Sequence, residues 1–260
     1  MTRVSLLIAQ RNAGSLVAGQ VPAACRALHR LTGDYEVLVV DDASSPENFA
    51  LLTDLLGTVP SLQLLRLDRP CGLSAALTAG IHAARGQCLI NLPAGNEAFT
   101  ELIEPLLDAL VRADLVVGRP RRDAWRKAMH RLMRIPRWLL LGLEVRDPEC
   151  QVWAARREAL DGLHLPRGMY RYLATLVSAR GYRVGEIPVP TPGRSDQLSD
   201  GYANPGDLLA AWWLKKRWRP YEVRRLPARD AAETTSPQQP TPVDETVPES
   251  QTPKFWRRSA

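Results

Sequence analysis

Two adjacent carboxylates, Asp41 and Asp42, come directly after the apolar run at residues 35–40, and the hydroxyl of Ser44 follows two positions later. Ionised carboxylates accept hydrogen bonds from ring N–H and hydroxyl groups, so this group is able to bind a polar small molecule. The same residue types are also favoured in turns and at helix N-termini, where they cap backbone N–H groups. Taken alone, these residues leave both interpretations open.

Basic side chains gather in two short segments, and the net charge of the chain is +6. Such segments suit anionic partners, namely nucleotides, lipid phosphates, an acidic membrane surface or nucleic acid. Either segment also fits a solvated helix face. No recognisable nucleic-acid-binding module accompanies them, so we expect no specific nucleic-acid partner. The basic residues are Arg119, Arg121, Arg122, Arg126, Lys127, Arg131, Arg134 and Arg137, and then Lys215, Lys216, Arg217 and Arg219.

Three tryptophans, Trp212, Trp213 and Trp218, lie beside the second basic segment. Aromatic side chains flanked by cations are typical of helices in the headgroup layer of a membrane. Tryptophans that pack on the domain core while the cations face water give the same pattern. The sequence does not decide between these two interpretations.

The cysteines exclude two kinds of site. Cys25, Cys71, Cys88 and Cys150 are scattered, with no Cys-x-x-Cys pair and no histidine at ligand spacing. This pattern argues against a zinc site and against a disulfide framework, and predicts free thiols in a reducing cytoplasm. We find no secretory signal and no apolar run long enough to cross a bilayer, which favours a cytoplasmic protein.

Short apolar runs alternate with longer amphipathic stretches along the first half of the chain. This alternation predicts an α/β fold with a mostly parallel central sheet flanked by helices. Ligands of such sheets bind beyond the carboxyl ends of the strands, where Asp41, Asp42 and the turn at residues 93–95 are expected. The expected strands are residues 4–8, 35–40, 62–67, 88–92 and 115–117, and the expected helices are residues 15–31, 46–56, 73–84 and 100–112.

Composition divides the chain into three expected parts. Residues 1–200 carry the α/β pattern, and residues 201–228 form a basic, tryptophan-rich amphipathic extension. Residues 229–260 are rich in Pro, Thr, Ser, Glu and Gln and have almost no apolar periodicity. Such a segment buries too little apolar surface to offset its ordering entropy, so we expect a disordered tail.

Six segments in order resemble the dolichol-phosphate-mannose-synthase-like branch of the family-2 glycosyltransferases, which charge polyprenyl phosphates. The resemblance extends over roughly residues 3–218. The segments are residues 4–12, similar to an opening strand that ends in Tyr-Asn-Glu; 35–44, similar to Val-Asp-Asp-Gly-Ser; 69–86, similar to Asn-x-Gly-x-x-x-Ala-x-x-x-Gly-x-x-x-Ala-x-Gly; 146–150, similar to Arg-Asp-x-x-Cys; 182–189, similar to Tyr-x-x-x-Glu-Ile-Pro-Val; and 193–195 with 207–214, similar to the end of the family's domain.

The resemblance implies a GT-A type nucleotide-diphospho-sugar transferase fold. It also implies transfer of a sugar from a nucleotide diphosphate sugar to a polyprenyl-phosphate-like acceptor, by a protein held peripherally at the inner face of the cell membrane. With this resemblance, the ligand-binding interpretation of Asp41 and Asp42 is favoured over capping. The implied nucleotide-sugar site comprises Ala9, Arg11, Asn12, Asp41, Asp42, Ser44, Gly72, Pro93, Ala94 and Gly95.

The resemblance places an acceptor phosphate among arginines, whose planar forks suit phosphate. Arg119 and Arg131 are the implied catalytic cations, together with Asp147. Because the acceptor phosphate is already ionised, Asp147 is expected to orient its neighbours rather than to take a proton. The implied acceptor-binding residues are Arg121, Arg122, Arg194 and Ser195.

One motif departs from the family. The family holds Mg²⁺ or Mn²⁺ with an Asp-x-Asp motif after the fourth strand, because hard cations prefer carboxylate oxygens. That position reads Pro93-Ala94-Gly95 here, and Asn96 and Glu97 offer oxygens only one to two positions later. The resemblance therefore implies a divalent metal, but the acidic motif that holds this metal in the family is missing from this chain.

This departure leaves two functions open. The first is an active sugar transferase that works without a metal. Arg11 replaces a donor-side residue of the family's opening strand, and together with the later arginines it is able to neutralise a diphosphate. The alternative is a catalytically inactive relative that binds nucleotide or scaffolds a partner enzyme.

Overall fold

The computed structural model describes residues 3–95, 97–120, 142, 150–190, 198 and 205–217. In these residues a seven-stranded sheet has the order β3-β2-β1-β4-β6-β5-β7. The strand β6 is antiparallel to both of its neighbours, and the remaining pairs are parallel. The strands are β1 (Val4–Gln10), β2 (Tyr35–Asp41), β3 (Leu62–Arg66), β4 (Cys88–Asn91), β5 (Leu115–Pro120), β6 (Trp153–Arg156) and β7 (Val184–Val189).

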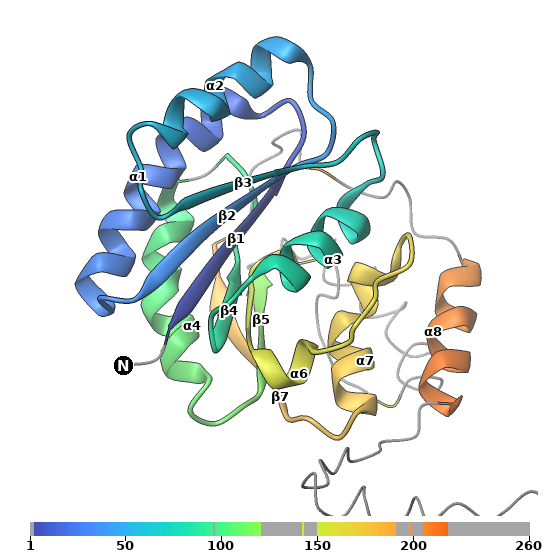
Figure 1. Cartoon of the computed structure of the whole chain (residues 1–260). Helices are drawn as coiled ribbons and strands as arrows, with labels where there is room; N and C mark the ends of the chain where they lie inside the picture. The colour runs from blue at the N-terminus through green and yellow to red at the C-terminus, as the bar shows by residue number, and fades with distance from the viewer. Residues whose placement is uncertain are drawn as a thin grey trace, which may run out of the picture. The chain divides into compact units, whose positions relative to one another are not determined.

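Helices cover both faces of this sheet, so the expected α/β architecture is confirmed. The helices α1, α2 and α4 lie on one face, and α3, α6, α7 and α8 lie toward the other (Figure 1). The helical elements are α1 (Gly14–Leu31), α2 (Pro46–Leu56), α3 (Leu73–Ala83), η1 (Glu97–Leu102), α4 (Ile103–Ala109), α6 (Arg157–Leu160), η2 (Met169–Tyr172), α7 (Leu173–Ala179) and α8 (Pro205–Arg217).

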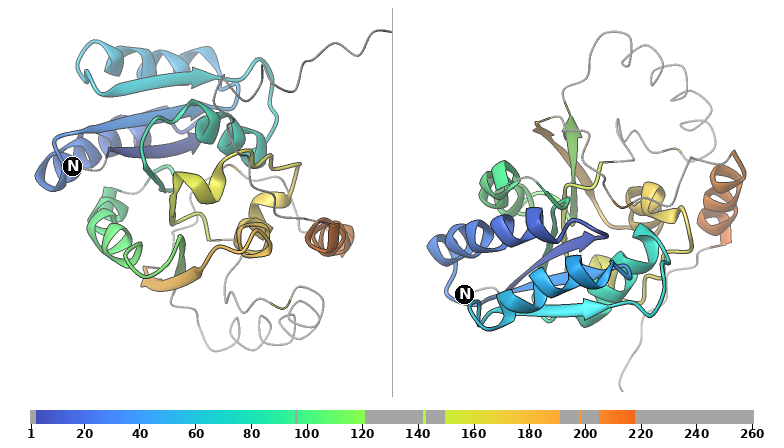
Figure 2. Two further views of the ribbon diagram at one scale, coloured as in Figure 1. Left: turned by 60° about the horizontal axis from the view of Figure 1, so that its bottom comes forward. Right: turned by 90° about the horizontal axis from the view of Figure 1, so that it is seen from above.

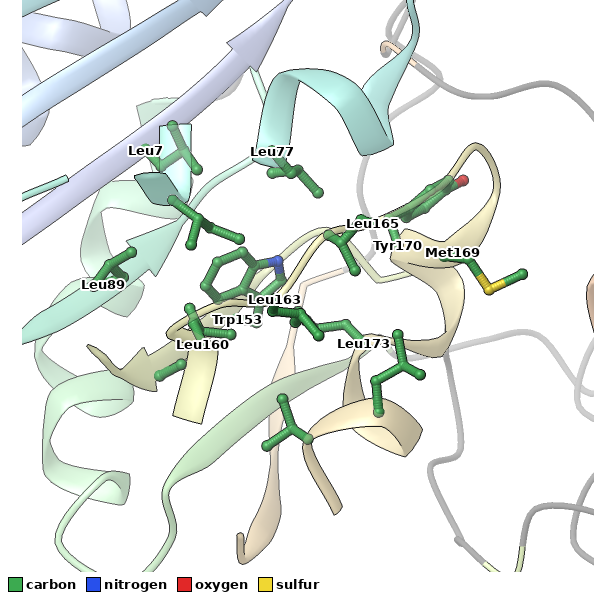
Figure 3. Close-up of a cluster of buried hydrophobic side chains, with 14 of the residues drawn as sticks. Leu7, Leu77, Leu89, Trp153, Leu160, Leu163, Leu165, Met169, Tyr170 and Leu173 are labelled. Atoms are coloured by element: carbon green, nitrogen blue, oxygen red, sulfur yellow. The ribbon is translucent and has the colours of Figure 1, made fainter. Parts of the chain in front are cut away.

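Alternating side chains of the central strands supply two cores, one on each face of the sheet. On β1, Leu6 and Ile8 belong to the core beneath α1 and α4, whereas Leu7 and Ala9 belong to the core beneath α3. Because both faces are covered, the strand reads as a continuous apolar run. Trp153 of β6 is nearly fully buried at the centre of the second core, beside Leu77 and Leu160 (Figure 3).

One expected helix is wrong in part. The stretch predicted as a single helix over residues 100–112 begins instead as the 3₁₀ turn η1, and α4 runs only from Ile103 to Ala109. Pro105 lies in the first turn of α4, where the missing N–H has no partner to lose. Because Pro105 has no N–H to donate to the carbonyl of Glu101, and its ring crowds that carbonyl, a regular α-helix cannot continue through this turn to the N-terminal side.

The helix α8 separates its tryptophans. Trp212 is half-buried and packs against the core together with fully buried Ala211, whereas 51% of Trp213 is exposed. Trp212 thus fits the core-packing interpretation, the headgroup interpretation stays a prediction for exposed Trp213, and Trp218 lies outside the described residues. Both views in Figure 2 place α8 beside α7 and away from β1–β3. In the described part of the chain, no helix combines the length and apolarity that a membrane span requires.

Candidate functional site

Three polar side chains line up across the carboxyl edge of the sheet. In the register of the parallel strands, Gln10 of β1 lies opposite Asp41 of β2, and Asp41 lies opposite Arg66 of β3. Strands of a parallel sheet end at a common edge, so chain positions far apart converge there. Sequence reasoning found Asp41 but missed Gln10 and Arg66. The signal available was the occurrence of a polar residue at the end of each apolar run.

Both oxygens of the buried Asp41 carboxylate have partners within the protein. Oδ1 accepts hydrogen bonds from the Gln10 side-chain amide and from the Ser44 hydroxyl. Oδ2 accepts the Ser44 backbone N–H at 3.2 Å and lies 3.5 Å from Nε of Arg66. A carboxylate offers about four acceptor positions, and the Asp41 side chain is fully buried. Asp41 is therefore buried, and both of its oxygens are engaged by neighbouring residues of the protein.

Asp42 joins β2 to the start of α3. Its Oδ1 accepts the backbone N–H of Cys71 at 2.6 Å, and Oδ2 accepts that of Gly72 at 3.1 Å. Gly72 has φ = 90°, a left-handed conformation that glycine adopts without strain. The buried carboxylate thereby satisfies the N–H groups of the two residues that precede α3 and fixes the turn that leads into this helix. Of the interpretations that the sequence left open, these hydrogen bonds of Asp42 fit turn chemistry before α3.

Ser44 ties the loops after β1 and β2 together. Its hydroxyl accepts the backbone N–H of Asn12 at 2.8 Å, and the Asn12 side chain accepts the N–H of Ser45 at 2.9 Å. Asn12 and Ala43 have φ values of 55° and 53°. Alanine rarely adopts such values, and local strain of this kind gathers at functional sites. These hydrogen bonds fix the loops after β1 and β2 to each other at the carboxyl edge of the sheet.

Arg66 is the exposed member of the group. Its Nη2 donates to the backbone carbonyl of Ser44 at 3.0 Å, and its guanidinium carbon lies 4.0 Å from the centroid of the Phe49 ring. The cation thus contacts Asp41, Ser44 and Phe49 while 41% of its side chain stays exposed. Of the two charged groups in this ion pair, the Arg66 guanidinium is the one that a ligand can reach.

The turn that replaces the acidic motif is held by α1. The side-chain amide of Gln20 donates to the carbonyl of Pro93 at 3.0 Å and accepts the N–H of Gly95 at 2.9 Å. Gly95 has φ = 93°, whereas Pro93 and Ala94 are buried. Sequence reasoning did not single out Gln20, which is 73 residues away in the chain.

These residues do not fit a divalent cation. The turn contributes backbone atoms that Gln20 already engages, and the Glu97 carboxylate lies against α1, 2.5 Å from where a Cβ on Gly19 would lie. In the described ranges, no group of three or more His, Cys, Asp or Glu side chains could hold a metal ion. Asn96 lies outside the described residues. We therefore derive no reaction step through a metal.

The remaining predicted residues divide into three groups. Arg11, exposed after β1, and Arg119, half-buried on β5 and in register with Pro188, lie toward the same carboxyl edge of the sheet. Ala9 is buried in the core on β1, so its side chain does not reach a ligand. The other predicted residues lie outside the described ranges: Asp147, Arg131, Arg121, Arg122, Arg194 and Ser195.

Curated proteins similar to this chain include sugar transferases named for polyprenyl phosphates. The undecaprenyl-phosphate 4-deoxy-4-formamido-L-arabinose transferase of Aeromonas hydrophila is 30% identical over 65% of this chain and 53% of its own length. The dodecaprenyl-phosphate galacturonate synthase of Rhizobium johnstonii is 25% identical over 73% of this chain and 58% of its own length. The chain thus spans little more than half the length of these relatives, and the resemblance to this branch is confirmed.

Solved structures with the same fold include glucosyltransferases. Glucosyl-3-phosphoglycerate synthase from Mycobacterium tuberculosis, in complex with phosphoglyceric acid, aligns with a TM-score of 0.60 at 16% identity and covers 82% of this chain and 80% of that chain. The same enzyme has been solved with Mn²⁺, uridine diphosphate and glucosyl-3-phosphoglycerate. A mannosyltransferase from Pyrobaculum calidifontis, in complex with GDP-mannose and Mn²⁺, aligns with a TM-score of 0.52 at 20% identity, over 75% of this chain and 58% of that chain.

The fold expectation is confirmed by these likenesses, which at such identities concern the fold alone. Residues 10–163 match the family described as glycosyl transferase family 2, and this range contains β1 from its last residue, β2, β3, β4, β5 and β6. The chain therefore belongs to glycosyl transferase family 2 and has a GT-A type fold.

Proposed function

We propose that the chain transfers a sugar from a nucleotide diphosphate sugar to a polyprenyl-phosphate-like acceptor. The observation that carries this proposal is the family-2 match over residues 10–163, whose strand ends meet at one fixed polar edge. The names of the curated relatives support the acceptor class. The donor lies over the carboxyl ends of β1, β2 and β4, where ligands of parallel sheets bind.

Arginines neutralise the leaving diphosphate in this proposal. Arg11 and Arg119 lie at the carboxyl edge, and Arg131 is the further cation that the family resemblance assigns. A guanidinium donates two parallel hydrogen bonds to a phosphate and stays charged at every physiological pH. The turn at Pro93, Ala94 and Gly95 carries no carboxylate that could hold a metal, so neutralisation by arginines is the route that fits these side chains.

The acceptor phosphate needs no strong base, because it is already ionised before it attacks the sugar. Asp147 orients neighbouring groups, and cationic and hydroxyl side chains hold the acceptor. We assign this binding role to Arg121, Arg122, Arg194 and Ser195. Placing an anionic nucleophile among fixed cations lowers the barrier mainly through orientation.

We further propose that the protein lies peripherally at the inner face of the cell membrane, with α8 in the headgroup layer. On α8, Leu209 and Trp213 are exposed one turn apart, and Arg217 stacks on Trp213 at 4.9 Å. An exposed aromatic with adjacent cations suits an interface that contains anionic lipids. This location brings the site to a lipid-linked acceptor.

Calorimetric titration with guanosine and uridine diphosphate sugars, with and without Mn²⁺ or Mg²⁺, tests the donor. Incubation of the same full chain with a labelled donor and a polyprenyl phosphate tests transfer. We expect donor binding that a chelator does not abolish, and label in the lipid fraction that an Arg119→Gln variant forms more slowly. Absence of binding to every donor, with and without metal, would exclude the proposed function.

A second candidate, a catalytically inactive relative that binds nucleotide or scaffolds a partner, is favoured by one observation. The turn at Pro93, Ala94 and Gly95 lacks the carboxylates of the family motif. The two candidates differ in the second measurement only. Donor binding without label in the lipid fraction, at any metal concentration, would favour the inactive relative.

A further inference from the structure

One edge of the Arg66 guanidinium is left for a ligand. Nε faces the Asp41 carboxylate at 3.5 Å, and Nη2 donates to the Ser44 carbonyl at 3.0 Å. These two nitrogens form one side of the planar group. The opposite edge, formed by Nη1 and the second N–H of Nη2, has no hydrogen-bond partner in the part of the chain that the structure describes. It presents two parallel N–H donors.

This donor edge is fixed as well as free. Phe49 covers one face of the guanidinium at 4.0 Å, so Arg66 is held by an ion pair, a hydrogen bond and a ring at once. Arginine normally loses side-chain entropy when it binds, and prior fixing reduces that loss. With 41% of the side chain exposed, the fixed group remains accessible.

Asp41 offers the opposite situation. Its carboxylate is fully buried, accepts one hydrogen bond from Gln10 and two from Ser44, and forms an ion pair with Arg66. A ligand that donated to Asp41 would have to displace one of these partners. Displacement inside a buried network leaves a polar group unsatisfied, which is costly. At this point of the edge, a ligand therefore meets donors rather than acceptors.

The position of Arg66 indicates which part of a donor it meets. Two strands, β2 and β1, separate β3 from β4 in the sheet. With a spacing of about 4.8 Å between strands, Arg66 lies roughly 14 Å from the end of β4. The proposed function places the diphosphate near the turn after β4, so the nucleoside of an elongated donor extends toward β2 and β3.

Resting on that proposed function, we propose that Arg66 binds the nucleoside of the donor and selects a base with two adjacent acceptors. Guanine presents such a pair in O6 and N7, and cytosine presents one in O2 and N3. Adenine has an amino donor beside N7, and uracil has an N–H between its two carbonyls. Asp41 is a positioning residue that aims the arginine.

Calorimetric titration of the full chain with GDP, CDP, UDP and ADP tests this assignment. In the unmodified protein, we expect GDP or CDP to bind more tightly than both UDP and ADP by about tenfold, since a bidentate pair discriminates by roughly 1–3 kcal/mol. Arg66→Lys keeps a cation beside Asp41 but has no fork. It should weaken binding of the preferred nucleotide about tenfold and remove the ranking, while the melting temperature stays close to that of the unmodified protein.

Two further variants decide the interpretation. Arg66→Gln should lower the affinity for the preferred nucleotide at least as much as Arg66→Lys does. The control is Arg112→Gln, which removes the same charge from an exposed position before β5 and should leave the ranking of the nucleotides intact. Unchanged or tighter binding by both Arg66 variants would mean that the freed Asp41 carboxylate is the base ligand, and would overturn the inference alone. An unmodified protein that binds no nucleoside diphosphate would overturn the proposed function as well.

Discussion

At the scale of single residues, the carboxylates that follow β2 act first on the protein itself. Asp41 completes a buried network with Gln10, Ser44 and Arg66, and Asp42 holds the N–H groups of the two residues before α3. Buried polar groups are costly when they are unpaired, so both acids stabilise the site by being satisfied. In the function that we propose, the cations and loops that these acids position bind the ligand.

We expect Asp42→Asn to destabilise the protein by about 2 kcal/mol, because hydrogen bonds to a charged acceptor are worth roughly 1.5–3 kcal/mol. The amide has one acceptor oxygen in place of two, and its NH₂ group would face the N–H of Cys71 or Gly72. Chemical denaturation measures the change. Asp68→Asn, in the exposed loop before α3, is the matched control and should lie within about 0.5 kcal/mol of the unmodified protein. Equal stability of both variants would contradict the role of Asp42 in holding the turn before α3.

Asp114 gives a prediction about pH. The pKa of Asp114 is lowered, mainly because the backbone N–H of Arg183 donates a hydrogen bond to Oδ2 at 2.8 Å. This hydrogen bond outweighs the effect of burial, which raises the pKa. The side chains of Arg183 and Arg156 act in the same direction as this N–H. A lowered pKa in the folded state adds stability that is complete above the unfolded pKa of about 3.9 and is lost as pH falls through the folded value.

The matching variant is Asp114→Asn. At neutral pH we expect it to lower the free energy of unfolding by about 1 kcal/mol, since the hydrogen-bonded acceptor loses its charge. Denaturation curves at several pH values should show this difference shrinking as the pH drops below the unfolded pKa. A difference that stays constant down to the most acidic measurable pH would show that the charge of Asp114 is not what stabilises.

At the scale of elements, β1 and β2 depend on a buried carboxylate that anchors a loop. Glu36 accepts the Ser5 hydroxyl at 2.6 Å and the Arg85 backbone N–H at 2.5 Å. The next residue, Gly86, donates to the Ser5 hydroxyl at 2.7 Å. The loop from α3 into β4 thereby lies directly against the backbone of β1, and this contact sets where β4 begins.

We therefore expect Gly86→Ala to destabilise the protein by about 3 kcal/mol, at the upper end of overpacking costs. A Cβ at this position would lie 2.6 Å from the backbone nitrogen of Ser5, which cannot move without shifting β1. Gly33→Ala is the matched control, because nothing lies within 4 Å of its added Cβ. Thermal melting compares the two. Melting temperatures that fall equally in both variants would mean that the close approach is not responsible.

The sequence predicts some elements well and others poorly, for physical reasons. The bounds of α2, Pro46–Leu56, match the expected helix, because a proline at its start and a glycine after its end mark it locally. The strand β6 was not predicted, since Trp153–Arg156 is short and runs antiparallel within a pattern that indicated parallel strands. Local pattern marks strands and helices, but it does not fix where a short strand inserts in a sheet.

The site follows the same division. Asp41 and Asp42 were predictable as residues at the end of a strand, because the apolar run before them is evident. The partners of Asp41 were not, since Gln10 and Arg66 reach it through the register of three strands. The contact of Gln20 with Pro93, 73 residues apart, was not predictable either. Such pairings depend on the packed sheet, and a single sequence carries no direct signal for them.

At the scale of the whole molecule, apolar side chains that remain exposed are distributed over several elements. On α8 they come with cations: Leu209 and Trp213 share one exposed face, with Lys216 and Arg217 in the next turn. On α2, exposed Leu51 has no cation in the adjacent turns of the helix. Scattered apolar residues are normal on a protein surface, whereas an aromatic with flanking cations suits a lipid interface.

The double variant Leu209→Ala/Trp213→Ala tests whether α8 contacts lipid. Full-length protein should sediment with vesicles that contain phosphatidylglycerol and much less with vesicles of phosphatidylcholine alone, because each cation near an anionic surface contributes about 1 kcal/mol. The double variant should reduce binding at least tenfold, since each side chain would otherwise bury apolar surface worth roughly 1.5 kcal/mol or more. Leu51→Ala is the control for loss of an exposed leucine and should bind as the unmodified protein does.

Raising the salt concentration should weaken the interaction in all three proteins, because screening acts on the cations and not on the apolar contact. If the double variant instead sedimented as the unmodified protein does, with the same salt dependence, α8 would not be the lipid contact, and the binding would have to come from cations elsewhere in the chain.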